Sequence, residues 1–204
     1  KNWLIYYPVE KFLSRYTDTQ ICINMEDFNR AKKFKAKRVE YIPGVGIDEK
    51  KIRNLSKSEP EYKEKLIKEF GIEKEDRVLI TAGEMIERKN QIFLLDVVEK
   101  LKEKVNKKIK LIICGHGRLE DVLKARVKEL GIEENIIFAG YRNDLYSILS
   151  LGDIFLFSSL QEGLPVAVME AMATGLPVVC SAVRGNLDLI DDKMGGYTVE
   201  SFDS

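Results

Sequence analysis

The chain has 204 residues, of which 45% are hydrophobic and 32% are charged, as is ordinary for a soluble globular protein. This length accommodates one large or two small domains with a buried core. Basic and acidic side chains number 33 each, which argues against a general affinity for nucleic acid.

The first part of the chain mixes helical and extended patterns. Apolar spacing predicts helices over residues 1–15 and 26–34, and strands over 19–24 and 39–42. Pro43–Gly46 then breaks the pattern, so we expect a domain junction near residues 43–48. Residues 47–76 are charged and are expected to be mostly helix or loop. Because the chain begins with Lys in the middle of an amphipathic pattern, we expect it to be a piece of a longer protein.

Three local features allow more than one interpretation. Arg30–Arg38 is the densest basic run; its ordinary role is a solvated helix face, and the alternative is contact with an anionic membrane surface or acceptor. The cysteines at 22, 114 and 180 have no metal-type spacing and are expected to be reduced thiols, the last two in the core. The apolar run Leu164–Val183 could suggest a membrane span, but strand, helix and strand explain it better because Glu170 and two prolines interrupt it.

From Arg77 onward, short apolar strands alternate with helices. This alternation predicts an α/β fold with a doubly wound, Rossmann-like parallel sheet in a domain covering residues 46–204. Strands that are apolar on both faces support this, because helices cover both sides of such a sheet. The expected strands are 78–82, 109–114, 135–139, 154–157, 178–180 and 197–199; the expected helices are 90–105, 119–130, 144–151 and 165–174, with a helical turn at 187–190.

Ligands of parallel sheets bind at the carboxyl ends of the strands, and the loop Gly83–Asn90 stands at such an end. Gly83 lets a ligand approach the backbone closely. Arg88 and Lys89 begin a helix, where free amides already favour an anion, so the pair would suit a diphosphate. The alternative is a charged surface turn.

A second loop, Gly115-His116-Gly117-Arg118, contains part of a dinucleotide-binding fingerprint. The third glycine is missing and no suitable acidic residue follows, so the fingerprint is weak. His116 is the only histidine in the chain and cannot build a metal cluster alone. A tight turn is the preferred interpretation.

The stretch 158–177 is the most informative in the chain. Gly163 and Pro165 begin a helix whose apolar sequence is interrupted only by Glu170, and a buried carboxylate is costly unless something binds it. Glu170 lies about 7.5 Å along the axis, where it could accept both hydroxyls of a ribose while the helix amides take phosphate oxygens. Glu162 could hold a sugar hydroxyl beyond the phosphates. One nucleoside diphosphate sugar would use all three parts; the alternative is that Glu170 pairs with a buried lysine or arginine.

These segments resemble the Glu-x7-Glu motif and neighbouring motifs of the family-4 retaining glycosyltransferases. Residues 1–45 look like the end of the N-terminal domain of capsular and exopolysaccharide members, and Tyr41–Asp48 resembles their interdomain junction. The matching segments are Glu162–Pro165, Glu170–Ala173, Gly175–Val179, Gly83 with Arg88–Asn90, Gly115–Gly117, Gly140–Asp144 and Gly185–Ile190.

The resemblance implies a glycosyltransferase B fold of two Rossmann-like domains with the active site between them. Residues 1–45 would end the acceptor domain, and 46–204 would form a nucleotide-sugar domain truncated at its C-terminus. No metal or other cofactor is expected, since cations and helix amides would stabilise the leaving diphosphate. By motif position the site consists of Glu162 as the catalytic residue at the donor sugar, Glu170 at the ribose, Lys89 with Arg88 and Gly83 at the diphosphate, the backbone of Gly163, Leu164 and Pro165 at sugar and phosphates, and Tyr141 with Arg142 beside the base.

The function that the resemblance implies is transfer of a sugar, with UDP-sugar as the default donor, to a saccharide or lipid-linked acceptor in bacterial surface polysaccharide synthesis. We expect a cytoplasmic protein, with peripheral attachment to the inner membrane face as an option, and an isolated fragment without activity. Two positions depart from the family pattern: Glu84 where arginine is common, and Asp188 where glutamate is common. The alternatives are a nucleotide-sugar epimerase and a non-catalytic Rossmann-like association module.

Overall fold

The computed structural model describes residues 3–44, 46–191, 194–200 and 202. The chain divides into two compact units, Lys1–Gly46 and Ile47–Ser204. None of the helices in these described ranges is both long and apolar enough to cross a membrane.

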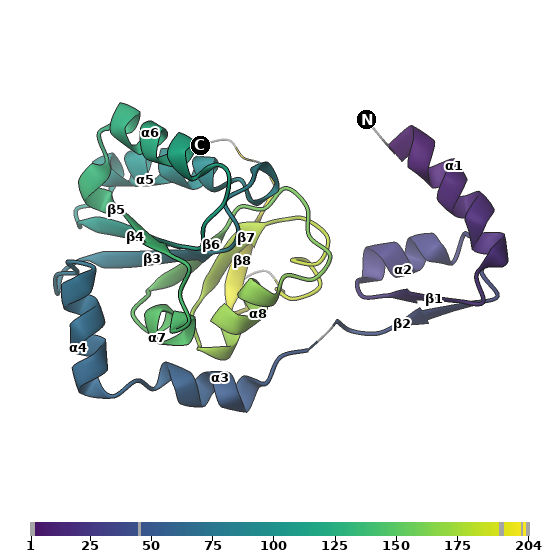
Figure 1. Cartoon of the computed structure of the whole chain (residues 1–204), viewed down its shortest axis with the longest axis horizontal. Helices are drawn as coiled ribbons and strands as arrows, with labels where there is room; N and C mark the ends of the chain where they lie inside the picture. The colour runs from purple at the N-terminus through teal and green to yellow at the C-terminus, as the bar shows by residue number, and fades with distance from the viewer. Residues whose placement is uncertain (1–2, 45, 192–193, 201, 203–204) are drawn as a thin grey trace. The chain divides into compact units, whose positions relative to one another are not determined.

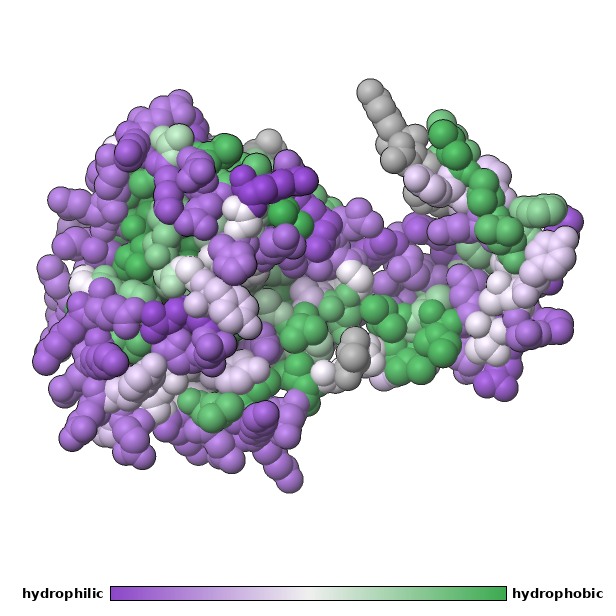
Figure 2. Space-filling model, viewed as in Figure 1, coloured by the Kyte–Doolittle hydropathy of each residue, from purple (hydrophilic) through white to green (hydrophobic). Residues whose placement is uncertain are grey.

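The first unit is a small helix and strand assembly. Two parallel strands pair with Thr19 opposite Arg38 and Cys22 opposite Tyr41. The helix between them begins where the Asn24 side chain accepts a hydrogen bond from the Asp27 amide. Apolar side chains such as Leu4 and Ile5 stand exposed along the first helix, which is largely green in Figure 2. The elements are α1 (Trp3–Leu13), η1 (Ser14–Tyr16), β1 (Thr19–Cys22), α2 (Met25–Ala31) and β2 (Arg38–Tyr41).

The second unit alternates strands and helices as the sequence predicts (Figure 1). Its strands are β3 (Arg77–Ala82), β4 (Ile109–Cys114), β5 (Ile136–Gly140), β6 (Ile154–Phe157), β7 (Val178–Ser181) and β8 (Gly196–Val199). Its α-helices are α3 (Glu49–Ser56), α4 (Pro60–Glu69), α5 (Gln91–Lys104), α6 (Glu120–Leu130), α7 (Leu145–Leu149) and α8 (Val166–Ala173). Two 3-10 turns, η2 (Glu87–Lys89) and η3 (Glu133–Asn135), precede α5 and β5.

All six strands of this sheet run parallel, in the order β5-β4-β3-β6-β7-β8. From β3 the chain builds outward through β4 to β5, then returns to place β6 on the other side of β3. The winding direction therefore reverses between β3 and β6, and such a switch point leaves a crevice between the loops at the carboxyl ends of the two strands.

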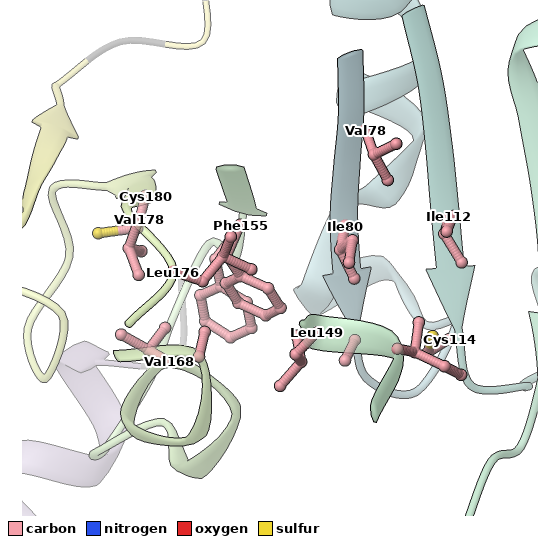
Figure 3. Packing of buried hydrophobic residues seen from close by; sticks show 14 of the residues in the cluster. Val78, Ile80, Ile112, Cys114, Leu149, Phe155, Val168, Leu176, Val178 and Cys180 are labelled. Atoms are coloured by element: carbon pink, nitrogen blue, oxygen red, sulfur yellow. The ribbon is translucent and has the colours of Figure 1, made fainter. Parts of the chain in front are cut away.

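Helices cover both faces of the sheet, because alternate side chains of each strand point to opposite sides. Ile80 belongs to a core cluster shared with α4, α7 and α8, whereas its neighbour Leu79 belongs to a cluster shared with α5 and α6. Figure 3 shows the first cluster, in which Val168 of α8 and Leu149 of α7 lie near Phe155. This two-faced burial confirms the predicted doubly wound parallel sheet.

The helix α8 is less enclosed than its sequence predicts. Its apolar residues led us to expect burial on every side, yet Val166 is 44% exposed and Met172 36% exposed. The expectation was wrong because α8 buries only one face, through Val168 and Ala171, against the sheet. The three cysteines are free, and Cys114 and Cys180 are buried as predicted; Cys22 is buried as well.

Candidate functional site

The loops that follow β3 and β6 meet at the switch point. The Leu160 amide donates to the Arg88 carbonyl over 2.8 Å, and the Ser158 hydroxyl lies 3.1 Å from the Lys89 carbonyl and 2.8 Å from the Asn90 carbonyl. Asn90 adopts the left-handed conformation with φ 53°, which turns the chain from η2 into α5. The two loops are thus tied together by a backbone hydrogen bond and by the Ser158 hydroxyl.

At this junction the predicted diphosphate cations contact the predicted sugar-binding carboxylate. Lys89 Nζ lies 2.7 Å from Glu162 Oε1, and Arg88 Nη1 lies 3.0 Å from the same oxygen. The side chains are 7% exposed for Glu162, 15% for Lys89 and 45% for Arg88. The carboxylate is therefore the buried partner, and Arg88 is the one that reaches solvent.

Two neighbours complete this cluster. The Ser159 hydroxyl donates to Glu162 Oε1 over 2.6 Å, so a third donor reaches the same oxygen. The Lys89 ammonium also lies 4.8 Å from the centre of the Phe157 ring, where the ring face attracts a cation. A buried carboxylate with several charge-assisted hydrogen bonds is held in one orientation.

Glu170 lies half-buried on α8, and its Oε1 accepts a hydrogen bond of 2.9 Å from the Tyr146 hydroxyl. The alternative that we considered, a buried lysine or arginine, is not what this oxygen contacts. Burial, and then the neighbouring carboxylate, raise the pKa of Tyr146, which therefore stays a neutral donor at physiological pH. The sequence offered no signal for this partner.

The helix start before Glu170 offers its own anion-binding groups. Pro165 caps α8, and the first amide within the helix to find an intrahelical acceptor is that of Met169, which donates to the Pro165 carbonyl. The preceding amides of the first turn are the ones that helices leave for phosphates. Gly163 packs closely here, since a Cβ on Gly185 would clash with its carbonyl oxygen.

The loop Gly115–Gly117 has a structural explanation. A Cβ on Gly115 would clash with the carbonyl of Gly83, and one on Gly117 would lie 2.5 Å from the carbonyl oxygen of Met85. The Met85 amide donates to the His116 carbonyl over 3.1 Å. The glycines therefore let this loop pack backbone to backbone against the loop after β3, which agrees with the tight-turn interpretation.

Tyr141 and Arg142 follow β5 in very different surroundings. Tyr141 is 72% exposed, and its ring centre lies 5.9 Å from that of His116. Arg142 instead donates to both oxygens of Asp144, each over 2.8 Å, and to Glu69 of α4. These carboxylates raise the pKa of Arg142, and Arg142 in turn holds the pKa of Asp144 at about 2. The guanidinium predicted beside a base is already occupied.

Glu84, the departure from the family pattern, has an exposed side chain, and its carbonyl accepts a hydrogen bond of 2.9 Å from Gln91. Sequence reasoning missed the buried residues behind the site, namely Ser159, Ser181 and Asn186. The available signal was the serines that follow the two apolar strand patterns, Ser158-Ser159 and Ser181; Asn186 had no such signal. No group of three or more His, Cys, Asp or Glu side chains within the described ranges is placed to hold a metal ion.

Known proteins resemble the chain in sequence. The family model described as "Glycosyl transferases group 1" matches residues 62–204. The "Putative glycosyltransferase EpsD" of Bacillus subtilis is 34% identical over 206 residues, covering 100% of this chain and 53% of the relative. A UDP-Gal:alpha-D-GlcNAc-diphosphoundecaprenol alpha-1,3-galactosyltransferase of Escherichia coli is 29% identical, covering 97% of this chain and 51% of the relative. The chain thus spans about half the length of these relatives.

Solved structures share the fold. The Anabaena protein Alr3699/HepE, determined in complex with UDP and glucose, superposes with a TM-score of 0.79 at 22% identity, covering 94% of this chain and 51% of that one. WaaG, a glycosyltransferase involved in lipopolysaccharide biosynthesis, gives a TM-score of 0.71 at 24% identity, covering 88% of this chain and 48% of that one. Both likenesses support the Rossmann-like fold.

Proposed function

The chain belongs to the family of glycosyl transferases group 1, and from that premise we propose that it supplies the donor site of a retaining glycosyltransferase. The donor is a nucleoside diphosphate sugar, and the acceptor a saccharide or lipid-linked saccharide in surface polysaccharide synthesis. Family membership leaves the epimerase and the non-catalytic module without support. The retaining outcome rests on the Glu-x7-Glu motif alone.

One observation carries the proposal: a buried carboxylate and two cations meet at the switch point of a parallel sheet. Lys89 and Arg88 bring positive charge to the crevice where ligands of such sheets bind, beside the amide-rich start of α8. A diphosphate would share these cations and amides, and the developing charge of the leaving group would be stabilised there. Glu162 would then face the donor sugar.

The other predicted contacts follow from their places around this crevice. Glu170 would accept the two ribose hydroxyls beside its hydrogen bond from Tyr146. Tyr141, exposed at the end of β5, would flank the base. Because Arg142 is saturated by carboxylates, we propose that it supports the loop carrying Tyr141 and does not bind the base itself.

We propose UDP as the nucleotide of the donor. The name of the Escherichia coli relative supports this choice, because it specifies UDP-Gal and a diphosphoundecaprenol acceptor. We further propose that Lys1–Gly46 is the end of an acceptor domain and Ile47–Ser204 the donor domain. EpsD aligns along 100% of the chain, so both units occur within one polypeptide in this relative.

Isothermal titration of UDP-, GDP- and ADP-sugars into the wild type and Glu170→Ala tests the proposal. We expect UDP-sugar to bind the wild type, and Glu170→Ala to weaken binding by about 10- to 100-fold, the value of hydrogen bonds to a charged group. The exposed Glu129 of α6 provides the matched control, since Glu129→Ala removes the same charge away from the crevice. Failure of every nucleotide to bind the wild type would refute the proposed function.

A further inference from the structure

A chain of buried hydrogen bonds lies behind Glu162. Ser159 and Asn186 are fully buried and Ser181 is nearly so. The Ser181 hydroxyl donates to the Ser159 carbonyl, and the Asn186 amide donates to the Ser181 carbonyl over 2.8 Å. Through these bonds the turn after β7 fixes the backbone of Ser159, whose own hydroxyl ends on Glu162.

The three groups that donate hydrogen bonds to Glu162 Oε1 differ in whether a bound diphosphate would also attract them. Lys89 and Arg88 are the cations that the proposed function assigns to the diphosphate, so a bound donor competes with Glu162 for them. Ser159 is neutral and fully buried, and its backbone is tied down on the far side. Its hydroxyl lies 2.6 Å from Glu162 Oε1, 3.0 Å from the Arg88 carbonyl and 3.4 Å from the Gln161 carbonyl, so the carboxylate is its nearest acceptor. Ser159 is therefore the donor that stays with the carboxylate when phosphate oxygens attract the cations.

Within the part of the chain that the structure describes, the hydrogen bonds to the Glu162 carboxylate all go to one oxygen, which leaves the other for a ligand. Lys89, Arg88 and Ser159 all approach Oε1, and none of the three reaches Oε2. A carboxylate oxygen of this kind accepts hydrogen bonds from sugar hydroxyls. The direction in which Oε2 points depends on how firmly Oε1 is held, since a rotated carboxylate would present a different oxygen to the crevice.

We propose that Ser159 is a positioning residue of the donor site: it holds Glu162 in place for the donor sugar while Lys89 and Arg88 engage the diphosphate. Ser181 and Asn186 support it by fixing its backbone. The proposal rests on the proposed function, because it assumes that Glu162 meets the sugar. Under this proposal, the residues that bind the diphosphate differ from the residue that positions the sugar-binding carboxylate.

The test compares UDP with UDP-glucose, UDP-galactose and UDP-N-acetylglucosamine by titration calorimetry on the wild type and Ser159→Ala. For the sugar that gains most over UDP in the wild type, we expect Ser159→Ala to weaken binding about fivefold or more while UDP binding changes less than about twofold. Retained UDP binding also reports that the variant is folded. In the Glu162→Gln background, adding Ser159→Ala should cause no further loss.

Ser158→Ala is the matched control, since Ser158 is a buried neighbour whose hydroxyl binds the Lys89 and Asn90 carbonyls and, within the described residues, makes no hydrogen bond to Glu162. We expect it to change UDP and UDP-sugar binding together. Equal loss of both ligands in Ser159→Ala, or additive loss on Glu162→Gln, would overturn this inference and leave the proposed function standing. Absence of any nucleotide binding to the wild type would overturn both.

Discussion

Two arginines at the same edge of the sheet, Arg88 and Arg142, both face carboxylates, yet their surroundings differ. Arg88 shares one oxygen of Glu162 with Lys89 and keeps 45% of its side chain exposed. Arg142 binds two carboxylates, lies 5.5 Å from the centre of the Phe70 ring and is 20% exposed.

The difference teaches that the number of partners, and not the place after a strand, distinguishes the cation that we propose for donor binding from one that supports the fold. Arg88 can exchange its carboxylate for another anion because solvent reaches it and Lys89 and Ser159 still hold Glu162. Arg142 cannot do so without leaving Asp144 and Glu69 side by side. Removing one partner of a half-buried ion pair lowers the free energy of unfolding more than removing one partner of an exposed pair.

The largest expected effect concerns the contact between the loops after β3 and β4, where Gly115 packs against Gly83. We predict that Gly115→Ala lowers the free energy of unfolding by about 3 kcal/mol or more, because backbone atoms would collide. Gly131→Ala is the control: Gly131 has φ 62° with open space around it, so only the left-handed strain of about 1 kcal/mol applies. Urea unfolding measures both, and equal losses would contradict the packing argument.

Next in size is a crossed pair of substitutions. Arg88→Met should weaken UDP-sugar binding by about 10- to 50-fold through the lost charge on the diphosphate. The free energy of unfolding should change little, because Arg88 is 45% exposed and Lys89 still binds Glu162. Arg142→Met should lower the free energy of unfolding by about 2 kcal/mol and leave binding largely intact. Titration calorimetry and urea unfolding on both variants give four values. If Arg142→Met weakened binding as much as Arg88→Met without destabilising the fold, the contrast between the clusters would be wrong.

Acid should weaken the Arg142 cluster. Arg142 first, and then the Tyr62 hydroxyl, lower the pKa of Asp144 from 3.8 to about 2. Because the pKa is lower in the folded state, ionised Asp144 stabilises the fold above about pH 4, and this contribution disappears as the pH falls through about 2. At pH 5 the free energy of unfolding of the wild type should exceed that of Asp144→Asn by about 1 to 2 kcal/mol, and this difference should shrink as the pH falls toward 2. Unfolding curves that keep the difference constant would contradict this.

The smallest expected effect concerns the turns that carry each cluster. The loop after β5 turns left-handed at Gly140, whereas the loop after β3 does so at Asn90, with φ values of 68° and 53°. Asn90→Ala should cost about 1 kcal/mol of unfolding free energy, and Asn90→Gly should change it by less than about 0.5 kcal/mol. A larger cost for glycine than for alanine, measured in urea, would show that the amide side chain matters more than the backbone.

Much of the fold could be predicted because periodic patterns are local. The strand Ile109–Cys114 and the strand Ile154–Phe157 have the predicted bounds, since both are mostly apolar segments flanked on each side by polar or turn residues. The exposure of α8 could not be predicted, because an apolar helix sequence does not say which of its faces the sheet covers. The role of Arg142 escaped for a similar reason: its partner Glu69 is distant in sequence.

The sequence by itself determined the alternating α/β pattern, the loops that could bind a diphosphate and the two glutamates with seven residues between them. These follow from residue type and spacing along the chain. Only the tertiary structure decided which polar groups meet: Lys89 with Glu162, Tyr146 with Glu170, and Ser159 behind the first carboxylate. Those contacts depend on where the sheet reverses its winding, and on which strands it places side by side, and neither is written in any local stretch of sequence.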